Sequence, residues 1–390
     1  MRVFLNIFFL LGFFFSLNSS IAQQKLDSAS SISLVTCGNG YDLYSIFGHT
    51  AIRVKDTVNN MDIVFNYGTF HFSDDFLVLF AMGKLNYTLS VQNYEGFERS
   101  YRLENRWVEE QVLNLNFNER QSVFDYLQTN YLPENREYLY DFFYDNCCTR
   151  SRDVFEATLG NRLQFNFTEQ QTDSTFKDLL DVYLGNMPWV DIGMDLGLGI
   201  PADKVLTERE KMYIPDYVYR AFDSATIQRN NKTEPFVLKT TRIVDSIDIK
   251  PSFNWFQPNV IFIGTLILWL LIAFIPIIKK SIYAWDALLF SITGLAGWLI
   301  VFLWFITDHT TTQINFDILW ANPFLFPIGL LALKRKKPLW LSYFFTATTS
   351  LSALVLVTWP FLPSDLNESF IPIILLLIWR SFVHSKIEKE

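Results

Sequence analysis

Asp145-Asn146-Cys147-Cys148-Thr149-Arg150 is the stretch on which the fold depends most, because it places a thiol where a helix is expected to begin. Asp145 or Asn146 is a favourable helix N-cap, which would put Cys147 in the first helical turn. The helix dipole favours a thiolate at that position. Cys148 points about 100° further round the helix axis, so only one of the two thiols can face a given base. A cysteine that is merely packed at a helix start is the alternative interpretation.

A nucleophilic cysteine needs a base within hydrogen-bond reach, and the sequence contains four histidines. His49 lies in Gly48-His49-Thr50-Ala51-Ile52-Arg53, which predicts a short strand. His71 and His309 could also reach an exported site, whereas His384 follows the last apolar run and could not. His49 is therefore the candidate base, although a strand histidine is more often an ordinary core or surface residue. For His309, an interfacial residue in contact with water is the simpler interpretation.

The strand that carries His49 is expected to form a hairpin with the next β-branched and aromatic run, residues 62–67. With Val54 near Asp62, His49 would lie beside Asn66 or Tyr67, and one residue of register slip would decide between them. Asn66 could then orient the imidazole, as the third member of a Cys-His-polar catalytic set.

Charge and cysteine content narrow the class of protein. The first 250 residues contain 23 Lys or Arg and 33 Asp or Glu, and this acidic balance argues against nucleic acid as a partner. Three cysteines are too few for a disulfide framework. Cys37 lies in a glycine-rich turn with no helix start to activate it, and we interpret it as structural.

Residues 1–22 have the pattern of a signal peptide. Arg2 precedes an apolar run over residues 3–17, and the following small and polar residues end in a Ser-x-Ala site, so we expect cleavage after Ala22. An uncleaved anchor is the alternative. In either case residues 23–250 are expected to be exported.

Residues 23–250 are predicted to form a domain of mixed α and β structure. Within it, the segment between 187 and 203 is rich in Gly and Pro. We interpret that segment as a loop on the bilayer surface or one that lines an acyl groove, with a plain packed loop as the alternative. Expected strands are 31–36, 50–54, 62–67, 85–90 and 109–115, and expected helices are 119–130 with an Asn118 cap, 147–159 and 174–184.

Residues 251–390 are expected to form an all-α membrane domain with about five helices. The apolar runs are 260–278, 282–306, 316–333, 339–361 and 370–379. The first four are long enough to cross a hydrocarbon core that needs about 20 residues. The last run is short and requires Arg380 to extend its charge to the interface, or else it is a re-entrant segment.

The distribution of Lys and Arg predicts the orientation. Basic residues lie between the first two runs, between the third and fourth (334–337), and after the fifth, whereas loops 307–315 and 362–369 contain none. Five spans with cytoplasmic basic loops place the first domain in the periplasm, so we expect a multi-pass protein of the inner (cytoplasmic) membrane.

Two family resemblances follow from these residues. The order of a strand histidine, a polar residue on the neighbouring strand and Asn-Cys at a helix start resembles the circularly permuted papain-like (NlpC/P60-type) enzymes, which implies an α+β periplasmic domain of that fold. Longer motifs resemble the Lnb family of lipoprotein N-acyltransferases. These motifs are Ser45-Ile46-Phe47-Gly48-His49-Thr50-Ala51-Ile52-Arg53-Val54, Phe65-Asn66-Tyr67-Gly68-Thr69-Phe70, Tyr140-Asp141-Phe142-Phe143-Tyr144-Asp145-Asn146-Cys147, Pro188-Trp189, Thr307-Asp308-His309 and Leu319-Trp320-Ala321-Asn322-Pro323.

The Lnb resemblance implies a mechanism. Cys147, deprotonated by His49, would take an acyl chain from a membrane phospholipid as a thioester and pass it to the α-amino group of a diacylglyceryl-cysteine lipoprotein. Cys148 stands where a small residue such as Ala is expected in relatives. No metal or nucleotide is expected, because the sequence has no ligand cluster or phosphate loop.

Other functions remain compatible with the sequence. A papain-like hydrolase, either a phospholipase or a cell-wall peptidase, would use the same residues, although a cell-wall peptidase needs no membrane domain. A non-enzymatic membrane assembly protein would need Cys147 only for packing.

Overall fold

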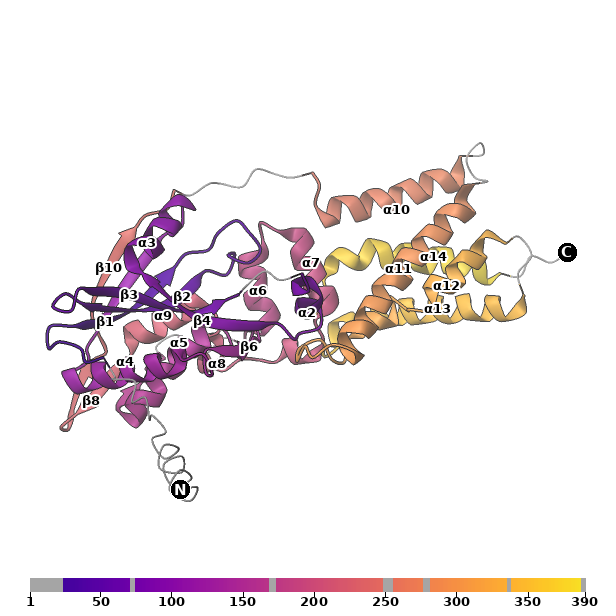
Figure 1. The fold of residues 1–390 in the computed structure, drawn as a ribbon. Helices are drawn as coiled ribbons and strands as arrows, with labels where there is room; N and C mark the ends of the chain where they lie inside the picture. The colour runs from indigo at the N-terminus through magenta and orange to yellow at the C-terminus, as the bar shows by residue number, and fades with distance from the viewer. Residues whose placement is uncertain are drawn as a thin grey trace, which may run out of the picture.

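The computed structural model describes residues 24–70, 74–167, 173–247, 255–275, 281–334 and 338–386. A sheet-rich domain lies at one end of an elongated molecule and a bundle of apolar helices at the other (Figure 1). The predicted signal peptide (1–22) and His71 lie outside the described residues. The order of elements agrees with the predicted α+β domain followed by a helical one.

Seven strands form the main sheet of the first domain, and each hydrogen-bonded pair is antiparallel. The hairpin that carries His49 is at the centre of this sheet, which protects it from edge fraying. In spatial order the strands are β10 (Val237–Val244), β5 (Val108–Leu113), β1 (Ser31–Cys37), β2 (His49–Asp56), β3 (Met61–Thr69), β4 (Asn86–Asn93) and β6 (Glu137–Leu139). A smaller sheet contains β7 (Leu163–Gln164), β8 (Thr226–Arg229) and β9 (Lys232–Pro235).

Both faces of the main sheet are covered, because side chains alternate between them along each strand. Ile52 and Phe65 point into a core that is shared with α4 (Phe117–Tyr131), α5 (Cys147–Leu159) and α9 (Pro215–Ser224). Ala51 and Val64 point to the opposite face, which α3 (Tyr94–Leu103) covers. Helix α5 packs directly on β2 and β3, and this contact brings its first turn to the end of the central hairpin.

Two local predictions were wrong. Helix α4 begins earlier than expected and is capped by Asn116 rather than Asn118, because Asn116 and Glu119 form a reciprocal capping box. The segment expected to be a loop contains helix α7 (Pro188–Gly197) and a short 3-10 turn, η2 (Ile200–Asp203). Pro188 occupies the first helical turn of α7, a position that proline favours.

Among the described residues of the second domain, three helices are long and apolar enough to cross a membrane. Two of them are α11 (Ile282–Phe305) and α13 (Leu339–Thr358), the latter extended by a 3-10 turn to Phe361, and the third is the span Glu368–Ser385, which contains α14 (Ile371–Ser385). Helix α10 (Pro258–Phe274) is apolar but shorter.

The run 316–333, which was expected to be a continuous span, is broken, and that prediction was wrong. It forms η4 (Phe316–Leu319), α12 (Leu325–Gly329) and η5 (Leu330–Leu333). The break between η4 and α12 contains Asn322-Pro323, and proline has no backbone N–H to donate to a continuing helix. The broken segment packs closely on α11, where a Cβ atom on Gly297 would lie 1.9 Å from the Ala321 carbonyl oxygen.

Arg380 is buried and does not extend to the membrane surface, so that expectation was also wrong. Its guanidinium forms two 2.8 Å hydrogen bonds to the carboxylate of Asp286 on α11. His384 belongs to α14 and bonds to the same carboxylate at 2.7 Å, and Trp269 of α10 donates to it at 3.3 Å. One buried carboxylate therefore holds three helices together.

Breaking this ion pair is expected to loosen the helical domain. Arg380→Met removes the guanidinium and leaves the buried Asp286 carboxylate with His384 and Trp269 as its partners. Loss of one partner of a buried pair typically costs about 3–5 kcal/mol. The thermal unfolding midpoint of the detergent-solubilised protein should fall by several degrees. The double variant Asp286→Leu/Arg380→Met is the control, because it leaves no unpaired charge and should recover much of the loss. Equal midpoints for the parent and Arg380→Met would contradict the assignment.

Candidate active site

The N-terminus of α5 is held in place by the buried side chain of Asn146. Its Oδ1 accepts the backbone N–H groups of Cys148 at 2.8 Å and Thr149 at 3.0 Å. Its Nδ2 donates to the carbonyl oxygens of Phe142 and Tyr213, at 2.7 and 2.8 Å. The helix start is therefore tied to the preceding loop and to the segment that leads into α9. Cys147 is the first residue of this helix, as predicted, and is half-buried.

His49 is the first residue of β2 and lies at the end of the sheet next to α5. It follows Gly48, whose φ of +81° and close approach to the Cys37 carbonyl (2.7 Å from an added Cβ) exclude a side chain there. Its Nε2 lies 2.5 Å from Oδ1 of Asn66 on β3. Since a carbonyl oxygen only accepts, Nε2 carries the proton, which leaves Nδ1 free to take a proton from a thiol.

The predicted contact between His49 and Asn66 is present, although the predicted register was off by one residue. Val54 pairs with Ile63, not Asp62, and continuing this ladder would place His49 level with Gly68. The side chain of Asn66, two residues before Gly68, nevertheless reaches His49. Just beyond Asn66, the pairing of β3 with β4 is irregular up to Thr69, and this irregularity changes the direction of the strand.

Gly68 brings the end of β3 against the first turn of α5. It has a φ of +84°, and a Cβ atom placed on it would lie 3.4 Å from Cβ of Cys147. The thiol is therefore packed directly over the hairpin that carries His49 and Asn66. Sequence reasoning did not identify this glycine as part of the site, although its position two residues after Asn66 was visible.

The two adjacent thiols have opposite electrostatic environments. The pKa of Cys147 is lowered well below its usual value, first by a hydrogen bond from Cys148, whose Sγ lies 3.9 Å away, and then by the charge and hydrogen bond of His49. The backbone N–H of Thr50 also lowers this pKa. Burial raises the pKa of Cys148, so it stays protonated, within 3.5 Å of the Thr50 hydroxyl.

The other candidate residues, Cys37 and His309, have environments that fit a structural role. Burial strongly raises the pKa of the Cys37 thiol, consistent with its interpretation as a structural cysteine. The ring of His309 bonds to the carbonyl oxygen of Ala81 at 3.2 Å, between the sheet domain and the end of α11. Among the described histidines, His49 is therefore the one whose charge lowers the pKa of Cys147.

The membrane domain supports the loop that precedes the thiol. Oδ1 of Asp141 accepts the backbone N–H groups of Phe143 and Tyr144, which shapes this loop. Its Oδ2 accepts a 2.8 Å hydrogen bond from Thr310, which follows α11. The position of Cys147 thus depends on a contact between the two domains.

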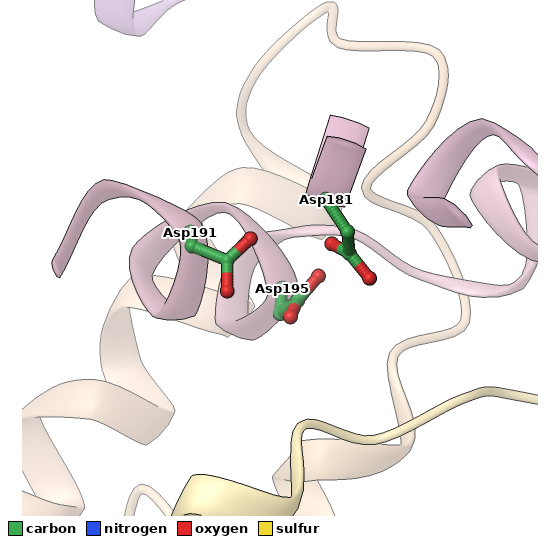
Figure 2. Close-up of side chains that lie close together, drawn as sticks. All are labelled: Asp181, Asp191 and Asp195. Atoms are coloured by element: carbon green, nitrogen blue, oxygen red, sulfur yellow. The ribbon is translucent and has the colours of Figure 1, made fainter. Parts of the chain in front are cut away.

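A second polar cluster, which sequence reasoning missed, lies at the domain junction (Figure 2). Asp181 of α6 (Phe176–Leu184) and Asp191 and Asp195 of α7 bring carboxylate oxygens within 4.8 Å of one another. They line a cavity of about 390 Å³. Burial, followed by the charge of Asp191, raises the pKa of Asp181 to about 7.

Carboxylate oxygens can bind hard cations. However, the amide of Asn367 donates to Asp195 at 2.7 Å, so one carboxylate already has a partner from the loop between α13 and α14. We assign no ligand to this cluster. The spacing of Asp191 and Asp195, four residues apart on one helix face, was the signal available in the sequence.

Taken together, the fold and the site define a membrane protein whose sheet-rich domain holds a polarised thiol beside a histidine. Comparison with protein families then identifies the chain as a member of the Lnb family. Residues 18–181 match the Lnb N-terminal periplasmic domain, and residues 249–390 match the Lnb transmembrane domain. Neither a curated protein nor a solved structure matches the chain.

The contact between the two thiols leads to a pH-dependent prediction. Cys148→Ala removes the hydrogen bond that lowers the pKa of Cys147, so a higher pH is needed to form the thiolate. The pH at which iodoacetamide alkylates Cys147 at half its maximal rate should rise, and the rate at neutral pH should fall. Peptide mass spectrometry would locate and quantify the label. Cys148→Ser keeps a donor and should shift the profile less; an unchanged profile for Cys148→Ala would refute the contribution of Cys148.

Proposed function

We propose that this protein is a lipoprotein N-acyltransferase, which moves an acyl chain from a phospholipid through a thioester on Cys147 to the α-amino group of a diacylglyceryl-cysteine lipoprotein. The observation that carries the proposal is the placement of Cys147 at a helix start beside the bonded pair His49 and Asn66 of β2 and β3, in a domain that matches a family of periplasmic domains. The matched transmembrane domain supports substrates that reside in a bilayer.

The periplasmic domain, residues 23–250, is assigned to the permuted papain-like (NlpC/P60-type) group. Support comes from the arrangement of α5 on β2 and β3, with the thiol at the helix start and the histidine on the sheet. The histidine precedes the cysteine in the chain, which is the order of the permuted enzymes.

In the first half-reaction the Cys147 thiolate attacks the ester carbonyl carbon of a phospholipid. The C–S bond forms and the ester C–O bond breaks, while His49 donates a proton to the departing lysophospholipid oxygen. The N-terminus of α5 points its dipole at the reacting carbon and stabilises the negative charge on the carbonyl oxygen. Asn66 keeps the imidazole in the tautomer that this transfer needs.

In the second half-reaction the α-amino group of the lipoprotein attacks the thioester. The amide C–N bond forms, the C–S bond breaks, and His49 takes the proton that the amine loses. The thiolate is regenerated with no net oxidation or reduction. Both proposed half-reactions use only side chains and the α5 N-terminus of this chain, and the proposed mechanism employs no metal or cofactor.

The proposed topology is multi-pass in the inner (cytoplasmic) membrane, with residues 251–390 as the transmembrane domain. Five crossings would use α10, α11, the broken segment of residues 316–333, α13 and α14. The basic loops of the sequence would then be cytoplasmic, and residues 307–315 and 362–369 would face the periplasm. Thr310 and Asn367 support this orientation, because both bond to residues of the sheet domain.

A hydrolase is the second candidate, because Cys147 is only partly buried and water could reach a thioester formed on it. A phospholipase would release the fatty acid, and a peptidase would cleave a cell-wall peptide. A non-enzymatic assembly role would need the thiol only for packing.

Mass spectrometry of a lipoprotein N-terminal peptide tests the proposal. In a host that lacks its own lipoprotein N-acyltransferase, the parent protein and Cys148→Ser should add a third acyl chain. Cys147→Ser and His49→Ala should add none, because the nucleophile or its base is missing. Parent protein that is inserted and well expressed but adds no chain would contradict the transferase. Released fatty acid or cleaved peptide would then favour a hydrolase, and function retained by Cys147→Ser would favour an assembly role.

A further inference from the structure

Helix α2 (Phe76–Ala81) is a short apolar helix whose role in the fold is not explained by the thiol site. It lies between β3 and β4, on the side of the sheet domain that faces the helical bundle (Figure 1). The carbonyl oxygen of Met82, at its C-terminal end, accepts the backbone N–H of Asp308 at 2.9 Å. Lys84 lies 3.8 Å from the carboxylate of the same residue.

These contacts fix α2 at the outer end of a membrane span. Asp308 and His309 follow α11 by only a few residues, and His309 also bonds to the carbonyl oxygen of Ala81. Gly83 permits this approach, because a Cβ atom there would lie 3.0 Å from the backbone nitrogen of His309. Helix α2 is therefore held at the level where the hydrocarbon region of a bilayer would end.

The exposed side chains of α2 are apolar. Val78 is 64% exposed and Phe80 is 52% exposed, on different sides of the helix, and the helix sequence Phe-Leu-Val-Leu-Phe-Ala contains no polar residue. Apolar side chains on a helix that lies beside membrane spans are favourable when they enter the outer leaflet and unfavourable in water. The position of α2 next to α11 makes the lipid leaflet the nearest apolar phase.

A series of aromatic rings leads from Phe80 toward the thiol. Tyr87 belongs to the main hydrophobic core of the sheet domain, and Phe76, Phe70, Tyr140 and Cys147 all pack against this core. Centroid distances between successive rings are 6.3, 5.2, 5.2 and 3.9 Å, for Phe80–Phe76, Phe76–Phe70, Phe70–Tyr87 and Tyr87–Tyr140.

We infer that α2 enters the outer leaflet and that an acyl chain of the donor phospholipid reaches Cys147 along this ring series. The inference rests on the proposed acyl transfer and adds where the donor lipid is taken up. A continuous row of rings is suited to a methylene chain and offers no partner for a charged peptide. The ester at the head of such a chain would then meet the thiol at the end of the hairpin.

The first measurement tests insertion without relying on activity. In a Cys147→Ala background, Val78→Cys is labelled with an environment-sensitive fluorophore, and the full-length protein is reconstituted in phosphatidylethanolamine/phosphatidylglycerol vesicles. Nitroxide-bearing lipids should quench this label. Val58→Cys is the matched control, because Val58 is 66% exposed in the β2–β3 turn, at the opposite end of β2 from His49. Its label should stay unquenched.

The second measurement tests donor uptake. Phe80→Asp should lower the rate of acyl transfer from long-chain phospholipid by about tenfold or more, since a charged side chain is unfavourable in an apolar phase. Alkylation of Cys147 by iodoacetamide should keep the parent rate, which shows that the thiol site is intact. Val58→Asp should leave both rates unchanged.

The outcomes separate this inference from the proposed function. A water-exposed label at position 78, or unchanged transfer by Phe80→Asp, would overturn the inference even if the parent is an active transferase. Binding of another protein to α2 in place of lipid would give the first of these results. A quenched label together with a parent that transfers no acyl chain would overturn the proposed function and the acyl route, while membrane insertion of α2 would stand.

Discussion

The buried amide of Asn146 is the group on which the rest of the site depends. It satisfies two backbone N–H groups at the start of α5 and two carbonyl oxygens from other segments, so its full hydrogen-bonding capacity links three parts of the chain. Removing such a residue would leave several buried polar groups without partners, each at a cost of about 1–3 kcal/mol. The position of Cys147 relative to the sheet follows from this cap.

The sheet supplies the complementary half of the site. Gly48 and Gly68 both adopt positive φ angles, which side chains would strain, and a Cβ atom on Gly48 would also lie only 2.7 Å from the Cys37 carbonyl oxygen. As a result, His49 is positioned at the end of β2 and the thiol lies over β3. A central, antiparallel hairpin is a rigid support, and rigid support is what a nucleophile and its base require. The two adjacent thiols are of the same residue type, but they differ in burial and in the direction in which their pKa values are shifted.

The two domains are joined by specific polar contacts around the site. Lys177 of α6 is buried, pairs with Asp203 at 3.2 Å, and bonds to the carbonyl oxygen of Asp365 between α13 and α14 at 2.7 Å. Thr310, which follows α11, donates to Asp141 in the loop before the thiol. These contacts hold the proposed acyl-transfer chemistry at the membrane surface, where both proposed substrates reside.

The sequence alone predicted the features that depend on residues close together in the chain. The helix start at Cys147 followed from a strong capping residue, and the contact of His49 with Asn66 followed from strand alternation, even though the register was one residue off. The sequence could not predict features that depend on distant partners. Arg380 is paired with Asp286 almost a hundred residues away, and the Asp181 cluster forms only when α6 packs on α7.

The most direct test of the account is to look for the acyl group on the thiol itself. Purified protein in vesicles would be incubated with phospholipid that carries a deuterated acyl chain, with no lipoprotein present, and the peptide that contains Cys147 and Cys148 would be fragmented by mass spectrometry. We predict one labelled acyl chain on Cys147, removable by neutral hydroxylamine and lost when a diacylated lipopeptide is added. An unmodified Cys147 in protein that nevertheless transfers the label to the lipopeptide would contradict the thioester mechanism.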